Sequence, residues 1–115
     1  MVIVITGASS GIGFETAKLL SLKGHKVYGL SRRVLSCEYF TSLPCDITDY
    51  ARTNECFKEI YEKEGRIDVL INNAGMGISG AVEYTKEEDI KKIFDINVLA
   101  LVNACKLVIP YMRAQ

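Results

Sequence analysis

The feature that most constrains the fold is a glycine-rich turn at residues 6–13, Thr-Gly-Ala-Ser-Ser-Gly-Ile-Gly. A β-branched run at residues 2–5 precedes it, and apolar residues at helical spacing follow it as far as Gly24. A strand–turn–helix unit of this kind presents unpaired backbone N–H groups at the positive end of a helix dipole. We therefore expect an anion site, in which Gly7 makes the sharp turn, Gly11 allows close approach to a phosphate and Gly13 lets the helix pack on the strand.

Short apolar runs alternate with longer helical patterns along the rest of the chain. The pattern predicts strands at 2–5, 26–30, 41–45 and 67–71. It predicts three helices: one at 12–23, one from an N-cap at Asp49 to a stop at Gly65, and one from a Thr85–Glu88 capping box almost to the C-terminus. The last helix is expected to bend near Asn97 and to kink or fray at Pro110. This alternation is typical of an α/β fold with a parallel sheet and right-handed crossovers.

Composition and charge narrow the function classes. Hydrophobic residues make up 49% of the 115 residues, enough for a core, and the formal net charge is +0. A neutral chain has no general attraction for nucleic acid or anionic membranes, so phosphate binding must come from a local site. No uninterrupted apolar run approaches the ~18 residues of a membrane span, and the N-terminus lacks the basic region of a signal peptide. We expect a cytoplasmic protein.

The cysteines do not predict a metal site. They have no C-x-x-C spacing and lie far in sequence from His25. In a reducing compartment they are expected to act as small hydrophobic residues. The residues concerned are Cys37, Cys45, Cys56 and Cys105.

The segment Thr6-Gly7-x-x-x-Gly11-Ile12-Gly13 resembles the cofactor motif of the short-chain dehydrogenase/reductase family. Further motifs follow in that family's order: Asp46-Ile47 after the third strand, Asn72-Asn73-Ala74-Gly75 after the fourth, and Asn97-Val98 in the next helix. The resemblance covers the whole chain. It implies a three-layer, Rossmann-type parallel sheet in a single partial NAD(P)-binding domain over residues 1–115, with strand order 3-2-1-4 and flanking helices.

The resemblance also implies roles for particular residues. Asp46 would accept a hydrogen bond from the adenine amino group, with Ile47 against the ring, and Asn97 would be catalytic, holding a water in a proton relay. Local alternatives stay open: Asp46 as a loop cap, Asn72 as a strand-end residue bonding its own backbone, and Asn97 as an ordinary bend residue. The residues expected along the phosphates and riboses are Gly7, Ser9, Ser10, Gly11, Ile12, Gly13, Asn73, Ala74 and Gly75.

The end of the second strand distinguishes NAD from NADP. A carboxylate there accepts bonds from the ribose 2′-OH, whereas an arginine pairs with a 2′-phosphate. The family's acidic position falls on Ser31, and Arg32 and Arg33 follow it. We therefore expect NADP(H) rather than NAD, with a solvated pair of loop arginines as the alternative.

The residues of the chemical step are missing from this chain. The family's catalytic Ser and Tyr-x-x-x-Lys lie beyond the asparagine helix, and no tyrosine here has a lysine four residues later. That tyrosine acts as general acid and base, and the lysine lowers its pKa. We expect the N-terminal half of an oxidoreductase whose parent transfers hydride between NADP(H) and a carbonyl or alcohol, with the C-terminal catalytic half absent and the chain alone inactive. The alternative is a non-catalytic dinucleotide-binding or interaction module, and the sequence downstream of Gln115 would distinguish the two.

Two surfaces are expected to associate with another copy of the chain. The strand at 67–71 would form an open sheet edge, and apolar residues wrap much of the helix at 98–112. We expect a homo-oligomer through one of these two elements.

Overall fold

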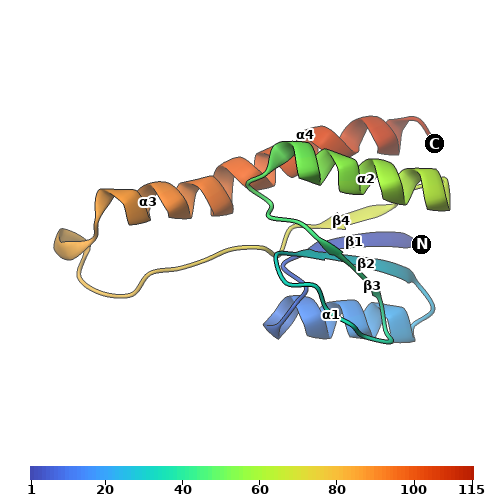
Figure 1. Cartoon of the computed structure of the whole chain (residues 1–115), viewed down its shortest axis with the longest axis horizontal. Helices are drawn as coiled ribbons and strands as arrows, with labels where there is room; N and C mark the ends of the chain where they lie inside the picture. Colours follow the sequence, from blue (N-terminus) through green and yellow to red (C-terminus); the bar gives the residue numbers. More distant parts are fainter.

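Four parallel strands form one sheet with helices on both faces in the computed structural model, which describes residues 1–115 (Figure 1). The strand order is β3-β2-β1-β4, so the predicted α/β fold and strand order are confirmed. The strands are β1 (Val2–Thr6), β2 (Lys26–Ser31), β3 (Thr41–Pro44) and β4 (Val69–Ile71). The helices on the sheet are α1 (Gly11–Leu22), α2 (Tyr50–Glu64) and α4 (Ala100–Arg113).

The central strand β1 is buried on both faces, as its β-branched sequence predicts. Ile3 and Ile5 pack in one core cluster with Ala17 of α1, whereas Val4 packs in the other with Phe57 of α2. Figure 1 shows the same division, with α1 on one face of the sheet and α2 and α4 on the other. The alternation of β1 side chains thus builds two cores, one on each side of the sheet.

The parallel register brings all four carboxyl ends of the strands to one edge. Thr6 pairs with Leu30 of β2, and Ser31 pairs with Pro44 of β3. On the other side of β1, Ile5 pairs with Ile71 of β4. The segments that follow the strands therefore leave the sheet close together, which is where open α/β sheets form their ligand crevices.

Helix α2 begins and ends as the sequence predicts. The Asp49 carboxylate accepts a hydrogen bond from the Arg52 backbone N–H at 3.1 Å, which makes Asp49 the N-cap. Gly65 ends the helix with φ of 76°, in the left-handed region where glycine is favoured.

The predicted capping box at Thr85 and Glu88 is wrong. Helix α3 (Glu87–Phe94) follows Lys86, and no side chain caps its N-terminus. The Thr85 hydroxyl instead donates backwards to the Ala81 carbonyl at 3.3 Å, at the end of the 3₁₀ turn η1 (Val82–Tyr84). A local side-chain bond to the preceding turn has therefore replaced the cap.

Helices α3 and α4 join through a π-helical turn, η2 (Asp95–Leu99), into one helix of 27 residues. The turn contains Asn97, where the sequence predicts a bend. Pro110 does not end α4, which runs on to Arg113, and the Pro110 carbonyl still accepts a bond from Ala114 N at 3.2 Å. The helix therefore does not fray at Pro110, and the alternative expectation, a kink there, stays a prediction.

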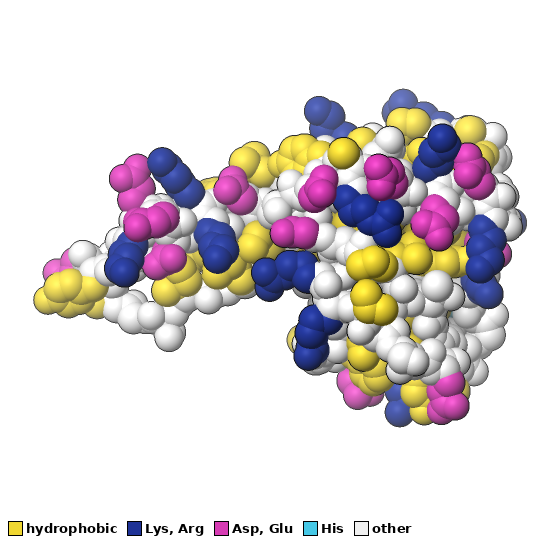
Figure 2. Space-filling view, viewed as in Figure 1, with side chains coloured by type: hydrophobic (Ala, Val, Ile, Leu, Met, Phe, Trp, Pro, Cys, Tyr) yellow, Lys and Arg dark blue, Asp and Glu magenta, His cyan; other side chains and the backbone are white.

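The long helix is apolar yet largely uncovered. Segment Glu87–Arg113 is long enough to cross a membrane, and an 18-residue stretch within it has a mean hydropathy of 1.7, of which 17% is buried. The helix contains no long uninterrupted apolar run because the charged residues Asp95 and Lys106 interrupt it. Its buried side chains, Ala100, Ala104 and Val108, lie on α4, which packs against α2. Figure 2 shows hydrophobic side chains along the rest of this helix, mixed with charged ones toward the projecting α3 end.

The N-cap of α2 can be tested directly. We expect Asp49→Ala to lower the free energy of unfolding by about 1 kcal/mol, because the Arg52 N–H loses its acceptor, and Asp49→Ser to keep most of it. Urea denaturation followed by circular dichroism measures this change. Glu62→Ala, which removes only an exposed pairing with Lys58, should cost less than about 0.5 kcal/mol, and an equal loss in both variants would contradict the capping role.

Candidate functional site

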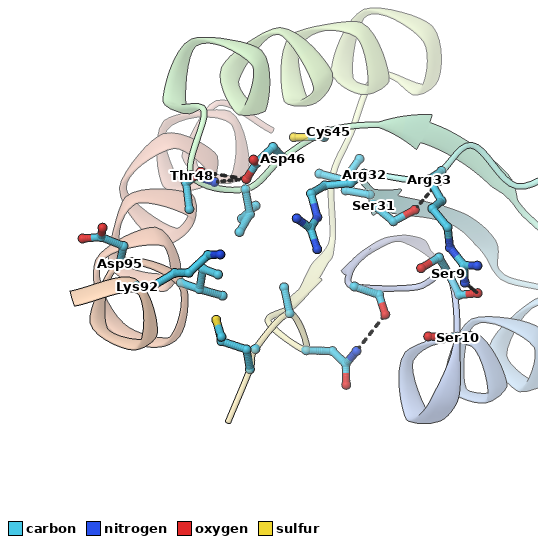
Figure 3. A pocket seen from close by; sticks show the side chains of 18 residues that line it. Ser9, Ser10, Ser31, Arg32, Arg33, Cys45, Asp46, Thr48, Lys92 and Asp95 are labelled. Carbon is cyan, nitrogen blue, oxygen red and sulfur yellow. Dashed lines mark hydrogen bonds between the residues drawn. The ribbon is translucent and has the colours of Figure 1, made fainter. Parts of the chain in front are cut away.

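A cleft of about 790 Å³ opens at the carboxyl edge of the sheet (Figure 3). Each strand contributes to it through the residues at or just after its end, and α3 and η2 close one side. The lining residues are Gly7, Ser9, Ser10, Leu30, Ser31, Arg32, Arg33, Cys45, Asp46, Ile47, Thr48, Asn73, Ala74, Gly75, Met76, Lys92, Asp95 and Ile96.

Three hydrogen bonds tie the glycine turn to the segment after β4. The buried Thr6 hydroxyl oxygen accepts from the backbone N–H groups of Asn73, at 3.1 Å, and Ala74, at 3.0 Å. In return, the Asn73 side-chain amide donates to the Gly7 carbonyl at 3.0 Å. The walls of the cleft that come from β1 and β4 are therefore held in a fixed relation.

The glycines of the turn are required for two different reasons. Gly7 and Gly11 have φ of 68° and 59°, a conformation that other residues rarely adopt. Gly13 has an ordinary φ, but a Cβ there would overlap the Gly7 carbonyl and the Asn73 amide. Gly13 thus lies in the first turn of α1, outside the cleft, and lets the helix pack closely on the Gly7 carbonyl and the Asn73 side chain, as the sequence predicts.

Some of the expected site residues lie away from the cleft. Gly11 and Ile12 line a shallower groove on the outer side of α1, and Ile12 is 81% exposed. The rotation of 100° per residue in a helix turns successive side chains away from the strand end, so a motif read along the sequence does not face one ligand throughout.

Asp46 is held as an anion at the wall of the cleft. The Thr48 hydroxyl donates to Asp46 Oδ1 at 2.7 Å and the Thr48 N–H donates to the same oxygen at 3.0 Å. These two bonds keep the pKa of Asp46 below its usual value. Asp46 does cap its loop, as the local alternative proposed, and Oδ2 makes no hydrogen bond to protein.

Two cationic side chains reach into the cleft without a carboxylate partner. Arg32, at the end of β2, and Lys92, on α3, form none of the salt bridges in the chain. Figure 3 shows their side chains pointing toward one another from opposite walls. The neighbouring Arg33 guanidinium instead donates to the Ser9 carbonyl at 3.4 Å. Such a cleft favours an anionic ligand.

No sequence motif marks Lys92 as a cleft residue. Its neighbour Lys91 pairs with Glu87 on the same helix at 3.5 Å. Only the path of the long helix past the sheet edge brings Lys92 to the cleft, and no local motif encodes that path.

Asn97 acts on the cleft through the backbone. Its Oδ1 accepts from Met76 N at 2.8 Å and its Nδ2 donates to Met76 O at 2.7 Å, so the carboxamide pairs with Met76 as a neighbouring strand would. Asn97 itself does not line the cleft. Its expected place in a proton relay stays a prediction.

A second carboxamide repeats this arrangement before β4. Gln115 accepts from Ile67 N at 2.9 Å and donates to Ile67 O at 3.1 Å. The long helix is therefore fastened to the chain on both sides of β4, at Ile67 by Gln115 and at Met76 by Asn97.

The comparisons with known proteins agree with one another. Residues 1–115 match the family model described as short chain dehydrogenase. A 3-ketodihydrosphingosine reductase of Bacteroides thetaiotaomicron is 46% identical over 113 residues, which cover 97% of this chain and 42% of that protein. Ligand-free aldohexose dehydrogenase of Thermoplasma acidophilum superimposes with a TM-score of 0.93 at 32% identity, covering 99% of this chain and 45% of that one. ElxO with NADP bound gives 0.90 at 30% identity, covering 98% and 50%. The chain thus spans half or less of the length of these three proteins.

The packing position of Gly13 gives a sharp prediction. We expect Gly13→Ala to lower the free energy of unfolding, because the methyl group overlaps the turn and must displace it at a cost of about 1–3 kcal/mol. This loss outweighs the ~1 kcal/mol that alanine gains over glycine in a helix. Chemical denaturation measures it against Gly77→Ala, where a Cβ has nothing within 4 Å. Equal stability of the two variants would show that the turn does not depend on this contact.

Proposed function

This chain belongs to the short-chain dehydrogenase family, and from that premise we propose that it binds the dinucleotide cofactor of an oxidoreductase. The whole protein would transfer hydride between a nicotinamide dinucleotide and a carbonyl or alcohol. The observation that carries this proposal is the convergence of four strand ends on one cleft that combines a glycine turn, an ionised Asp46 and two unpaired cations. A glycine turn alone would fit many anions, whereas this combination fits an adenosine joined to phosphates.

The residues present fit the cofactor at its adenosine and phosphate end. Ser9, Ser10 and the N-terminus of α1 would hold the pyrophosphate, since that helix end offers N–H groups and a favourable dipole. Asp46 would accept from the adenine amino group through its free Oδ2, with Ile47 beside the ring. Asn73, Ala74 and Gly75 would border the riboses. When bound, the dinucleotide supplies or accepts the hydride.

Asn97 would serve this site as a positioning residue. Because its carboxamide holds the backbone of Met76, it fixes the wall that follows β4. Any relay of protons through Asn97 would need the Ser, Tyr and Lys of the family's second half.

We propose NADP(H) as the cofactor. Ser31 stands where an acidic residue would accept bonds from a ribose 2′-OH, and its hydroxyl donates to the Arg33 carbonyl at 2.6 Å. Arg32 reaches into the same part of the cleft without a carboxylate partner, and Lys92 adds a second positive charge from the opposite wall. ElxO, a structural relative, has NADP bound.

The choice of cofactor is testable on this chain with adenosine fragments. We expect 2′,5′-adenosine bisphosphate to bind more tightly than 5′-AMP in calorimetric titration. Arg32→Ala should weaken the bisphosphate about tenfold or more, since hydrogen bonds to charged groups contribute ~1.5–3 kcal/mol, and should leave 5′-AMP within about twofold. Arg113→Ala, at the far end of α4, is the matched control. Tighter binding of 5′-AMP to the unaltered protein would overturn the assignment of NADP.

We also propose that the chain forms a homo-oligomer through its long helix. Ile90, Phe94, Val98 and Val102 recur every four residues and all are exposed. An apolar stripe of this kind gains free energy when a second apolar surface covers it. The free edge of β4 offers a second contact, since only its β1 side is paired.

Sedimentation velocity at rising concentration tests this association. We expect a species of at least twice the monomer mass, and we expect Val102→Glu to shift the equilibrium toward monomer without changing the circular dichroism spectrum. Lys58→Glu, on the exposed face of α2, should leave the mass unchanged. A folded monomer at high concentration in the unaltered protein would refute the proposal.

A further inference from the structure

The wall of the cleft contains a thiol next to the carboxylate of Asp46 in the sequence. Cys45 directly follows β3 and directly precedes Asp46, and it both lines the cleft and belongs to the core under α2. Its N–H donates to the Ser31 carbonyl at 2.8 Å, which fixes its backbone to the end of β2. Only 5% of the residue is exposed, so the cleft is its route to solvent.

A second thiol meets Cys45 from α2. Thr53 and Cys56 are three residues apart on this helix and therefore share one face, which is fully buried. The Thr53 hydroxyl oxygen lies 3.5 Å from Cys45 Sγ. Cys56 lies one turn beyond Thr53 on this face and belongs to the same buried core cluster as Cys45. The two cysteines are therefore neighbours in the core behind the cleft wall.

The surroundings favour the thiolate at Cys45. Arg52 Nε donates to the Pro44 carbonyl at 2.9 Å, which holds a guanidinium next to Cys45. The hydrogen bond from Cys56 lowers the pKa of Cys45, and Thr53 and Arg52 add to this effect against the opposing effect of burial. The pKa of Cys56 is raised, first by its hydrogen bond to Cys45 and then by burial. Cys45 is therefore the nucleophilic sulfur of the pair, whereas Cys56 stays protonated as a thiol.

We propose that Cys45 and Cys56 form a peroxide-sensitive thiol pair that closes into a disulfide at the wall of the cleft. The Cys45 thiolate attacks one oxygen of hydrogen peroxide; the O–O bond breaks, hydroxide leaves and takes a proton to become water, and Cys45 becomes a sulfenic acid. The Cys56 sulfur then attacks Cys45 Sγ, and the sulfenic oxygen leaves as a second water with the Cys56 proton. Two thiols lose two electrons and one peroxide is reduced to two waters.

The disulfide would change the neighbouring Asp46. A covalent S–S bond of about 2.05 Å is shorter than any contact between two thiols, so closure must draw Cys45 toward α2. Asp46 is the next residue and moves with it. The consequence, weaker binding of adenosine phosphates after oxidation, rests on the proposed function, whereas disulfide formation does not.

Peptide mapping of the peroxide-treated chain tests the disulfide. Reduced protein is treated with hydrogen peroxide, blocked with N-ethylmaleimide and digested without reductant. We expect the Cys45–Cys56 cross-link to form before Cys37 or Cys105 is oxidised, because the thiolate favoured at Cys45 outweighs the greater exposure of the other two cysteines. Cys56→Ser should leave a sulfenic acid at Cys45 that dimedone traps, and Cys105→Ser should leave the cross-link unchanged. Free thiols at Cys45 and Cys56 after Cys37 or Cys105 is oxidised would overturn the proposal, as would a cross-link that forms only in urea.

A second measurement separates this inference from the proposed function. Titration with 2′,5′-adenosine bisphosphate should show at least about fivefold weaker binding to the oxidised protein, because Asp46 is displaced, and dithiothreitol should restore it. Equal affinity in both states would refute the regulatory consequence. Failure of the reduced protein to bind the bisphosphate would count against the proposed function, while the mapping result would still decide the disulfide.

Discussion

The hydrogen bonds of the buried Thr6 hydroxyl hold the part of the cleft that comes from β1 to the part that comes from β4. By accepting from the N–H groups of Asn73 and Ala74, this oxygen satisfies two backbone donors that leave the sheet at the end of β4. The Asn73 amide completes the tie by donating to the Gly7 carbonyl, inside the turn itself. Buried polar groups that supply one another's hydrogen bonds form a rigid junction. The turn after β1 and the loop after β4 can therefore serve as adjoining walls of one site.

The orientation of the long helix depends indirectly on that junction. It joins the sheet late in the chain, after an extended loop, and few of its side chains are buried. What orients it is packing of α4 on α2 together with the carboxamides of Asn97 and Gln115, which pair with backbone on either side of β4. Through Asn97, the helix is tied to a loop that Thr6 already holds in place. The position of Lys92 at the cleft is thus a result of contacts made far from Lys92.

The sequence predicted those parts of the molecule that local chemistry determines. The β-branched run of β1, the cap at Asp49 and the stop at Gly65 each depend on a few neighbouring residues, and their positions agree with the structure. The capping box at Thr85 failed because the same hydroxyl had a nearer acceptor in the preceding turn. Lys92 and the Cys45–Cys56 contact could not be predicted, because each joins elements whose relative placement depends on packing across the whole sheet.

The π-helical turn η2 has a geometric consequence for the site. A π turn holds one residue more than an α turn, so it acts as a single-residue insertion within an otherwise regular helix. Each residue of an α-helix advances the direction of its side chains by about 100°. Removing one residue from η2 would therefore rotate α3 by roughly a quarter of a circle against α4, turning Lys92 off the cleft while leaving α4 seated on α2. The extra residue in η2 therefore sets which side of α3 faces the cleft.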